Sequence, residues 1–288
     1  MPRLKEILFP IDYSDACDRA APMVAAVASR FSAGVTVLHA ESARVSAESV
    51  DLYSPGSPSP SEVRDASMRE LNRFIARHFT SPAVNGMIQE GDPAQAIVAL
   101  TDKHACDLVM MPTHGCSPFH PLVCGSVTAK VLHEASCPVW TSAHIASTDP
   151  QSALEYRVMI CAVDRACDSE DLLRWADWFA RQYQATLKIV HVIPAYDETS
   201  QNCGELELAR YLLKVSRSDF QRLMTKAGVE KELLLRGGNI AGRLAETARQ
   251  QNADLLIVGR GHVQKVLGRL RTVLLGIIRE SPCPVISV

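Results

Sequence analysis

Short apolar runs alternate along the whole chain with longer segments of helical periodicity. The run Ile7 to Asp12 predicts a buried strand that ends at a carboxylate, and Val35 to Ala40 predicts a second strand. Between them lies a predicted helix, capped by Ser14 or Asp15 and ended by Gly34. Its apolar positions at helical spacing are Ala20, Met23, Val24, Val27 and Phe31.

The same alternation continues through the first half of the chain. The further predicted elements are helices over 61–78, 94–104 and from about 125, and strands over 84–89, 108–111 and 139–140. Residues 41–62 lack a core pattern and contain several prolines, which is typical of a surface loop. We therefore expect five strands and four helices in this half.

The second half repeats this order from Arg157. Three intervals match between the halves: 27 positions for Asp12–His39 and Asp164–His191, 16 for Gly91–Asp107 and Gly238–Asp254, and 22 for Gly115–Cys137 and Gly261–Cys283. The matches indicate a tandem duplication of one β-α-β-α-β-α-β-α-β unit, joined by a linker near residues 143–155. We expect domains at 1–145 and 156–288.

Strands that alternate with helices predict an α/β fold, in which each domain is a parallel sheet with helices on both faces. In such sheets, ligands bind outside the carboxyl ends of the strands, where the strand order switches. Asp12, the loop after Met111 and the end of the second strand would lie on that edge.

Composition is that of an ordinary globular protein: 288 residues, 47% hydrophobic and 22% charged, with a net charge of -2. This charge gives no electrostatic case for nucleic acid or for an anionic membrane. We expect no membrane span and no signal peptide, because no apolar run approaches the ~20 residues a span needs. Nine scattered cysteines indicate reduced thiols in the cytoplasm, with Cys17, Cys161 and Cys283 in the core.

One stretch, from Asp107 to Val139, combines a buried strand, a turn rich in small residues and a helix start. Within it, Pro112, Gly115, Gly125 and Ser126 have the spacing P-x2-G-x9-G-S. This resembles the nucleotide signature G-x2-G-x9-G-[ST] of the universal stress protein family, with proline in place of the first glycine. The resemblance covers the chain twice. It implies two tandem adenine nucleotide alpha hydrolase-like (Rossmann-like) domains, each a five-stranded parallel sheet in the order 3-2-1-4-5.

The resemblance also implies where ATP or AMP would lie in the first domain. The base and ribose would lie near Asp12, and the phosphates on the loop amides. Glycine lets the backbone approach an anion, and a serine adds a hydroxyl at a helix N-terminus. The candidate binding residues are Pro10, Ile11, Asp12, Ala40, Met111, Thr113, His114, Gly115, Gly125, Ser126 and Val127.

Each of these roles has a structural alternative. Asp12 and Ser126 would serve equally as helix caps, and the two glycines as turn or helix-start residues. Pro112 lacks an N–H and fixes φ, so the loop is expected to be remodelled if the first glycine of the signature needs a positive φ or donates to a phosphate.

The second domain departs further from the signature. Arg271-Thr272 stands where Gly125-Ser126 stands, and an arginine fills space that a phosphate would need. The loop is basic, through Arg260, Lys265, Arg269 and Arg271. Two interpretations stay open for it: a site for a small anion and a solvated charged rim.

No catalytic constellation stands out, since both G-x-S-x-G and G-x4-GK[ST] are absent. We expect a cytoplasmic stress-response regulator that binds an adenine nucleotide, with at most slow ATP hydrolysis in which His114 would orient water. The alternative is a ligand-free interaction protein with degenerate sites. In it the repeats pack as an internal pseudo-dimer through their last strands, and a further homodimer stays open.

A third alternative is a metal-binding variant. The run His114-x-Cys116-x3-His120-x3-Cys124 holds four residues of the types that bind zinc. The spacing matches no standard paired-cysteine site, so we assign no metal ligand. Cys106 and Cys137 are expected in the core.

Overall fold

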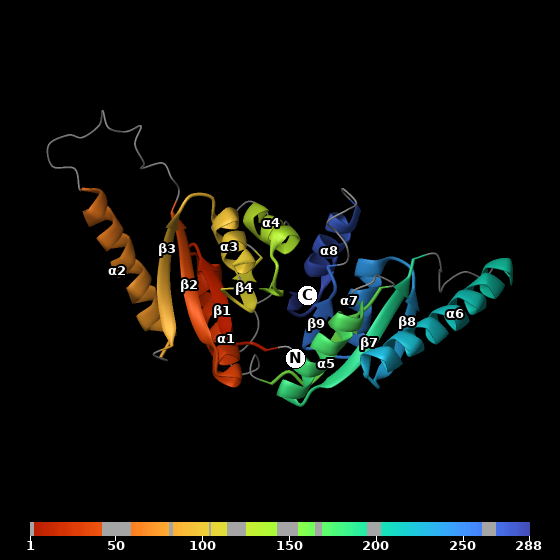
Figure 1. The fold of residues 1–288 in the computed structure, drawn as a ribbon. Coiled ribbons are helices and arrows are strands. Elements are labelled where there is room, and N and C mark those ends of the chain that lie inside the picture. Colours follow the sequence, from red (N-terminus) through yellow and green to blue (C-terminus); the bar gives the residue numbers. More distant parts are fainter. Residues whose placement is uncertain are drawn as a thin grey trace. The chain divides into compact units, whose positions relative to one another are not determined.

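A computed structural model describes residues 3–41, 59–80, 83–103, 105–113, 125–142, 155–164, 169–194, 203–260 and 269–288. The chain divides into two compact units, Arg3–Trp140 and Thr141–Val288 (Figure 1). Strands β1 to β5 form the sheet of the first domain, and β6 to β10 form that of the second.

The first domain alternates strands and helices. Its strands are β1 (Glu6–Ile11), β2 (Gly34–Glu41), β3 (Val84–Glu90), β4 (Leu108–Pro112) and β5 (Val139–Ser142). Its helices are α1 (Asp15–Phe31), α2 (Pro60–His78), α3 (Pro93–Asp102) and α4 (Ser126–Glu134).

The second domain repeats this order. Its strands are β6 (Val158–Ala162), β7 (Thr186–Ile193), β8 (Glu232–Gly237), β9 (Leu255–Val258) and β10 (Val285–Ser287). Its helices are α5 (Ser169–Tyr183), α6 (Cys203–Ala227), α7 (Ile240–Gln250) and α8 (Arg269–Glu280).

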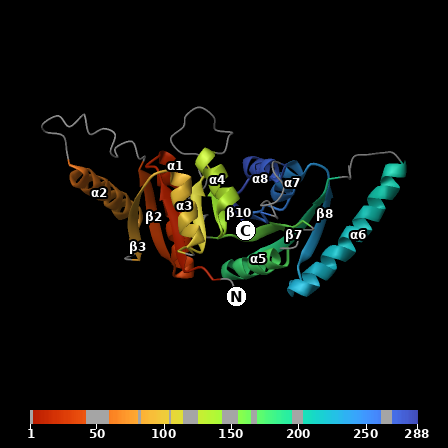
Figure 2. The same cartoon turned by 45° about the horizontal axis from the view of Figure 1, so that its top comes forward.

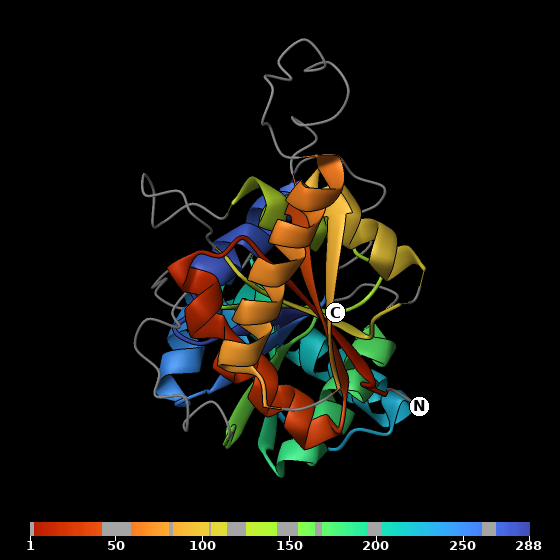
Figure 3. The ribbon, with the colours of Figure 1, turned by 90° about the vertical axis from the view of Figure 1, so that its left-hand side faces the viewer.

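Both sheets have the strand order 3-2-1-4-5. The first runs β3-β2-β1-β4-β5 and the second β8-β7-β6-β9-β10, and the strand pairs with recorded register are parallel. In the first domain α1 packs with α2 and α3 with α4, on opposite faces of the sheet (Figure 3). In the second, α5 pairs with α6 and α7 with α8 in the same way (Figure 2). The α/β fold expected from the sequence is confirmed.

Burial explains why the strands are short and apolar. Leu108 to Met111 and Leu255 to Val258 are buried without interruption, as strands covered on both faces must be. Close packing also favours glycine at position 86 of β3, because a Cβ there would lie 3.0 Å from the side chain of Leu71 on α2. Among the described residues, no helix combines the length and the apolarity needed to cross a lipid bilayer.

The ends of two helices differ from expectation. Helix α1 ends at Ser32, which takes the left-handed conformation (φ 52), and Gly34 already belongs to β2. The predicted loop 41–62 is too long, because α2 begins at Pro60; residues 42–58 lie outside the described part of the chain. A capping box starts α2: Ser59 accepts from the Glu62 N–H, and the Glu62 carboxylate accepts from the Ser59 N–H.

In each domain, an aspartate just before the fourth strand accepts hydrogen bonds from backbone N–H groups at the start of the first strand. Asp107 Oδ2 accepts hydrogen bonds from the backbone N–H groups of Lys5 (2.7 Å) and Glu6 (3.1 Å). Asp254 Oδ2 accepts from those of Arg157 (2.7 Å) and Val158 (2.8 Å). These contacts tie the start of the first strand to the fourth in each domain, which supports the duplication seen in the spacing.

Candidate functional site

The carboxyl ends of β1 and β2 carry the first group of candidate residues. Pro10 and Ile11 are the last residues of β1, whose pairing with β2 ends at Ile11↔His39. Gly34 donates its N–H to Lys5, and alternate residues of β2 from there face β1. Ala40 is among them and extends past the end of β1. Its backbone carbonyl therefore points to the β1 side of β2, past the last residue of β1.

Asp12 follows directly and takes part in the start of α1. Its Oδ1 accepts a hydrogen bond from the Ser14 N–H (3.1 Å) and from the Cys17 thiol (3.2 Å). Ser14 is the N-cap residue, but its side chain makes no capping hydrogen bond. Desolvation, as the largest cause, raises the pKa of the Cys17 thiol to about 12, so the thiol stays protonated and donates. Asp12 therefore holds the start of α1 through Ser14 and Cys17 rather than by accepting from a helical N–H group, and its exposed position is compatible with a ligand role.

The end of β4 is joined to the start of α4. Gly125 donates its N–H to the carbonyl of Thr113 (3.0 Å), and the Thr128 hydroxyl donates to the carbonyl of Pro112 (3.3 Å). Met111 and Thr113 are buried. Pro112 is the last residue of the strand, and the positive-φ residues do not include it. This position therefore needs no glycine conformation in the described backbone.

The N-terminus of α4 carries the remaining candidates, Gly125, Ser126 and Val127. Gly125 is the N-cap residue, no side chain caps the helix, and its first turn contains no acidic residue. Helices α2, α3 and α7 have capping side chains, and α1 has Asp15 and Asp18 in its first turn. Of these helices, only α4 has neither a capping side chain nor an acidic first-turn residue among the residues that the structure describes.

Two candidates, His114 and Gly115, lie outside the described residues, as do Cys116, His120 and Cys124 of the possible metal run. In the part of the chain that the structure describes, no group of three or more His, Cys, Asp or Glu side chains has the geometry to hold a metal ion. Cys106 and Cys137 are buried, as the sequence predicted.

The corresponding edge of the second domain contains a cavity of ≈ 120 Å³. Its walls include Leu244 of α7 and Ile277 of α8, and Asp164, Val192 and Arg260 also line it. Nucleotide-sized ligand pockets are typically about 300–1,000 Å³, so this cavity is small by comparison. Asp164 shares the helix-start role of Asp12, because Ser169 Oγ donates to its Oδ1 (3.3 Å).

His39 and His191 occupy equivalent positions at this edge of the two domains, and the sequence had suggested no role for either. The Nδ1 of His39 lies 3.1 Å from the Ile11 carbonyl, and that of His191 lies 2.8 Å from the Val163 carbonyl. Because a carbonyl only accepts, each Nδ1 carries the proton. The signal was present in the equal Asp-to-His spacing of the two halves, which we used only to establish the repeat.

Tyr13 was also missed. It has a positive φ of 59, and its ring lies 4.5 Å from that of His39. Its buried hydroxyl finds no hydrogen-bond partner in the described part of the chain. Tyr13 therefore packs the start of α1 against the end of β2 without a polar contact of its own.

Comparison with known proteins gives matches over both domains. The model of the universal stress protein family matches residues 3–142 and again 155–288. The Thermus aquaticus protein described as "Universal stress protein in QAH/OAS sulfhydrylase 3'region" is 34% identical over 138 residues, which cover 47% of this chain and 96% of that protein.

Solved structures give the same result. A universal stress protein from Archaeoglobus fulgidus matches with a TM-score of 0.66 at 18% identity, covering 99% of this chain and 96% of that one. A universal stress protein in complex with cAMP is 22% identical and covers 48% of this chain and 94% of its own, with a TM-score of 0.34. At 18% identity, the likeness to the Archaeoglobus fulgidus protein concerns the fold alone.

Proposed function

Because the chain belongs to the universal stress protein family, twice over, we propose that it is a stress-response regulator whose first domain binds an adenine nucleotide, ATP or AMP. The nucleotide would lie at the carboxyl edge of the first sheet, between the ends of β1 and β2 and the start of α4. We place the protein in the cytoplasm, where the described buried cysteines would stay reduced.

The uncapped N-terminus of α4 carries this proposal. Its first N–H groups and the helix dipole favour an anion, and no side chain of the described residues supplies one. The hydrogen bond from Gly125 to Thr113 brings this helix end to the end of β4. A phosphate would therefore meet backbone donors and the exposed Ser126 at the sheet edge where α/β proteins bind ligands.

Gly125 supports the same proposal. Its φ of -57 suits any residue, and an added Cβ would lie 3.5 Å from the Thr113 carbonyl, an ordinary contact. Glycine is therefore not needed here by the protein's own packing. It does allow a bound phosphate to approach the backbone more closely than a side chain would.

The base and ribose would lie on the other side of the switch in strand order, against Pro10, Ile11, Asp12 and Ala40. The carbonyl of Ile11 already accepts from His39, while that of Ala40 points to the β1 side, past the last residue of β1. An exocyclic amine of adenine is a suitable donor for such a carbonyl. Met111, Thr113, His114, Gly115 and Val127 complete the proposed contacts.

A regulatory role fits this arrangement better than an enzymatic one. The described residues of the site offer backbone donors, the hydroxyls of Thr113 and Ser126, and a carboxylate engaged in a helix start. That set binds a phosphate but supplies no activated nucleophile or base. Turnover would be limited to slow ATP hydrolysis. The pseudo-dimer of the two domains and a further homodimer remain predictions.

The test is calorimetric titration of the full chain with ATP, ADP, AMP and cAMP, with mass spectrometry of ligands released from freshly purified protein. We expect about one nucleotide per chain. Gly125→Arg should weaken binding by about 2 kcal/mol or more, roughly 30-fold. Gly125→Ala is the matched control and should bind within about threefold of the parent, because its Cβ fits.

No heat up to millimolar nucleotide, with no ligand released, would reject the proposal and favour the ligand-free interaction protein. Equal binding by Gly125→Arg, with its circular dichroism unchanged, would move the nucleotide away from α4.

A further inference from the structure

Two buried thiols face each other at the edge of the first sheet opposite the candidate site. Cys106 precedes β4 and Cys137 precedes β5, and their Sγ atoms are 3.8 Å apart. Both residues are buried, with 6% and 8% of their surface exposed. The entries to the two strands are already neighbours, because Val109 donates its N–H to the Pro138 carbonyl (2.9 Å).

The second domain lacks this pair. Asp107 and Asp254 make the same backbone contacts, so the residue before each of them also corresponds: Cys106 in the first domain and Ala253 in the second. Cys283 corresponds to Cys137, and its Sγ lies 3.7 Å from the Ser281 hydroxyl instead. Since the same fold forms with alanine at this position, the fold does not require the thiol of Cys106.

We propose that Cys106 and Cys137 form a modification site, at which a hydroperoxide oxidises the two thiols to a disulfide. One thiol loses its proton, and the thiolate attacks an oxygen of hydrogen peroxide; the O–O bond breaks, the sulfur becomes a sulfenic acid, and the leaving hydroxide takes up the proton to form water. The second thiol then attacks the sulfenic sulfur, forms the S–S bond and releases a second water. Two thiols are oxidised and one hydrogen peroxide is reduced, so the step balances. This site is independent of nucleotide binding.

The geometry favours this pair over other pairs among the described cysteines. A disulfide needs an S–S distance of about 2.05 Å, so the two sulfurs must close by roughly 1.8 Å, a change that rotation about the side-chain bonds can supply. Cys17 contacts Asp12 and Ser14, and Cys161 is fully buried within β6. The only sulfur–sulfur contact in the described part of the chain joins Cys106 and Cys137.

Burial makes the reaction slow but selective. The hydrogen bond between the two thiols and then desolvation raise the pKa of Cys106 well above its usual value. The thiolate that attacks peroxide is therefore scarce until the strand entries open locally. Once formed, the disulfide closes a loop between residues 31 positions apart, which contains β4, α4 and the segment between them. Oxidation should therefore stabilise the first domain.

The experiment uses the full chain with Cys116, Cys124, Cys167 and Cys203 changed to serine. Reduced protein is held with hydrogen peroxide for hours, alkylated under denaturing conditions and digested with trypsin, which cuts after Lys103, Lys130 and Arg157. The two cysteines then lie on separate peptides, 104–130 and 131–157. We expect these two peptides to be linked by a disulfide that dithiothreitol breaks. Before alkylation, the mass of the intact oxidised protein should be about 2 Da lower than that of the reduced protein.

Cys106→Ala is the control variant and should give no linked peptide. Oxidation of the parent should also raise its thermal midpoint by about 5 °C, reversibly with dithiothreitol. Cys106→Ala should show no such shift.

Three results would overturn the proposal. First, Cys106 and Cys137 could both be alkylated after a treatment that oxidises free glutathione. Second, disulfides between other cysteines could predominate in the folded chain. Third, oxidation could lower the thermal midpoint.

Discussion

The two domains share a framework and differ at its edges. Asp107 and Asp254 make the same backbone contacts, and His39 and His191 do the same at the opposite edge. By contrast, Gly125 of the first domain has an arginine as its counterpart, and Cys106 has an alanine. Sheet pairing depends mainly on buried apolar residues and backbone hydrogen bonds, which tolerate such changes. Binding and thiol chemistry depend on single side chains, which do not.

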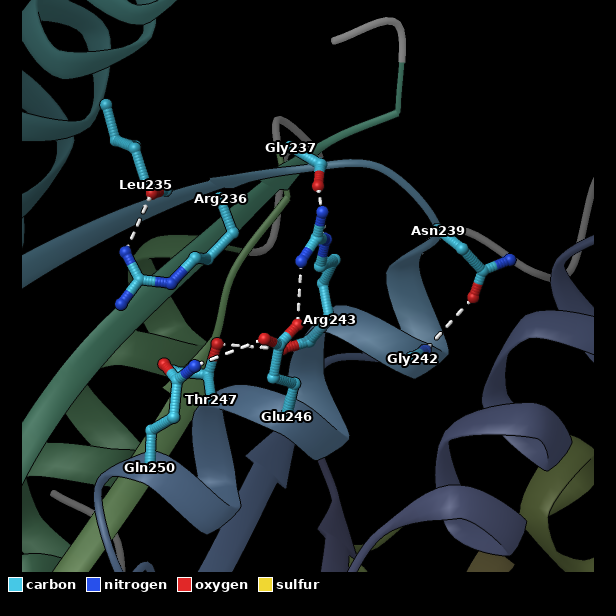
Figure 4. A network of polar contacts seen from close by, with 9 residues as sticks. All are labelled: Leu235, Arg236, Gly237, Asn239, Gly242, Arg243, Glu246, Thr247 and Gln250. Carbon is cyan, nitrogen blue, oxygen red and sulfur yellow. Dashed lines mark hydrogen bonds and ion pairs between the residues drawn. The ribbon is translucent and has the colours of Figure 1, made fainter. Parts of the chain in front are cut away.

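The turn before the third helix also differs between the domains, and Figure 4 shows the turn of the second domain. Both turns need a glycine in a positive φ, 116 at Gly91 and 113 at Gly238. In the second domain, Arg243 Nε donates to the Gly237 carbonyl (2.7 Å) and covers the glycine, whereas nothing lies within 4 Å of a Cβ position at Gly91. The same backbone is thus held in one domain by an added side chain.

The largest effect is expected from the shared framework. Asp107→Ala leaves two backbone N–H groups without their charged acceptor and should lower the free energy of unfolding by about 2–3 kcal/mol. Asp254→Ala should cost the second domain a similar amount. Urea unfolding with domain-resolved hydrogen exchange measures both.

Asparagine is the control at each of these positions, because its amide oxygen still accepts and should recover part of the loss. Losses that differ by more than about 2 kcal/mol between the domains would show that the two carboxylates are not equivalent.

A smaller effect is expected at the turn of the second domain. Arg243→Ala removes the hydrogen bond to the Gly237 carbonyl and should cost about 1 kcal/mol, with faster amide exchange over residues 237–243. Glu246→Gln removes the charge from the partly exposed ion pair to Arg243 (2.7 Å) and leaves an amide oxygen to accept from Arg243 or Gln250, so it should cost less than about 0.5 kcal/mol. If both variants lose equally, the ion pair rather than the carbonyl contact holds the turn.

A further small effect at neutral pH, of the opposite sign, is expected for Tyr13→Phe. Removing a buried hydroxyl that has no partner in the described part of the chain should change stability by less than about 1 kcal/mol, in the stabilising direction. Burial first, then the carboxylates of Glu70 and Glu41, raise the pKa of Tyr13 to about 12.

The sign of the pH effect follows from this shift. An unfolded tyrosine ionises near pH ~10. The stability that Tyr13 contributes is therefore present below about pH 10 and is lost as the pH rises toward 12. The difference in tyrosinate absorbance between the parent and Tyr13→Phe should titrate near pH 12. A midpoint near 10 would mean that the hydroxyl is solvated.

Much of the fold was accessible from the sequence because its signals are local and repeated. Continuous apolar runs gave β4 and β9, and equal intervals gave the duplication. The predicted ends of the helices were less accurate where two local sequence signals compete. The S-x-x-E capping box at Ser59 begins α2 within the predicted loop, and Ser32 rather than Gly34 takes the left-handed conformation that ends α1.

Of the candidate site, the sequence supplied the spacing of Gly125-Ser126 and the position of Asp12 at the end of the first strand. It left open whether Asp12 caps a helix, because that depends on where the Ser14 N–H points. The sequence also did not predict the contact between Cys106 and Cys137, since 31 positions separate them. Nor did the sequence show that Pro112 is the last residue of β4.

By itself, then, the sequence determined the α/β class, the tandem repeat and the family, because periodicity and spacing are properties of the chain. The tertiary structure decided which polar atoms meet: Asp12 with Ser14, Cys106 with Cys137, and Gly125 with Thr113. Such contacts depend on the packing of strands and helices that are distant in the chain. Packing fixes atoms to within an ångström, whereas a sequence pattern fixes only the face on which a residue lies.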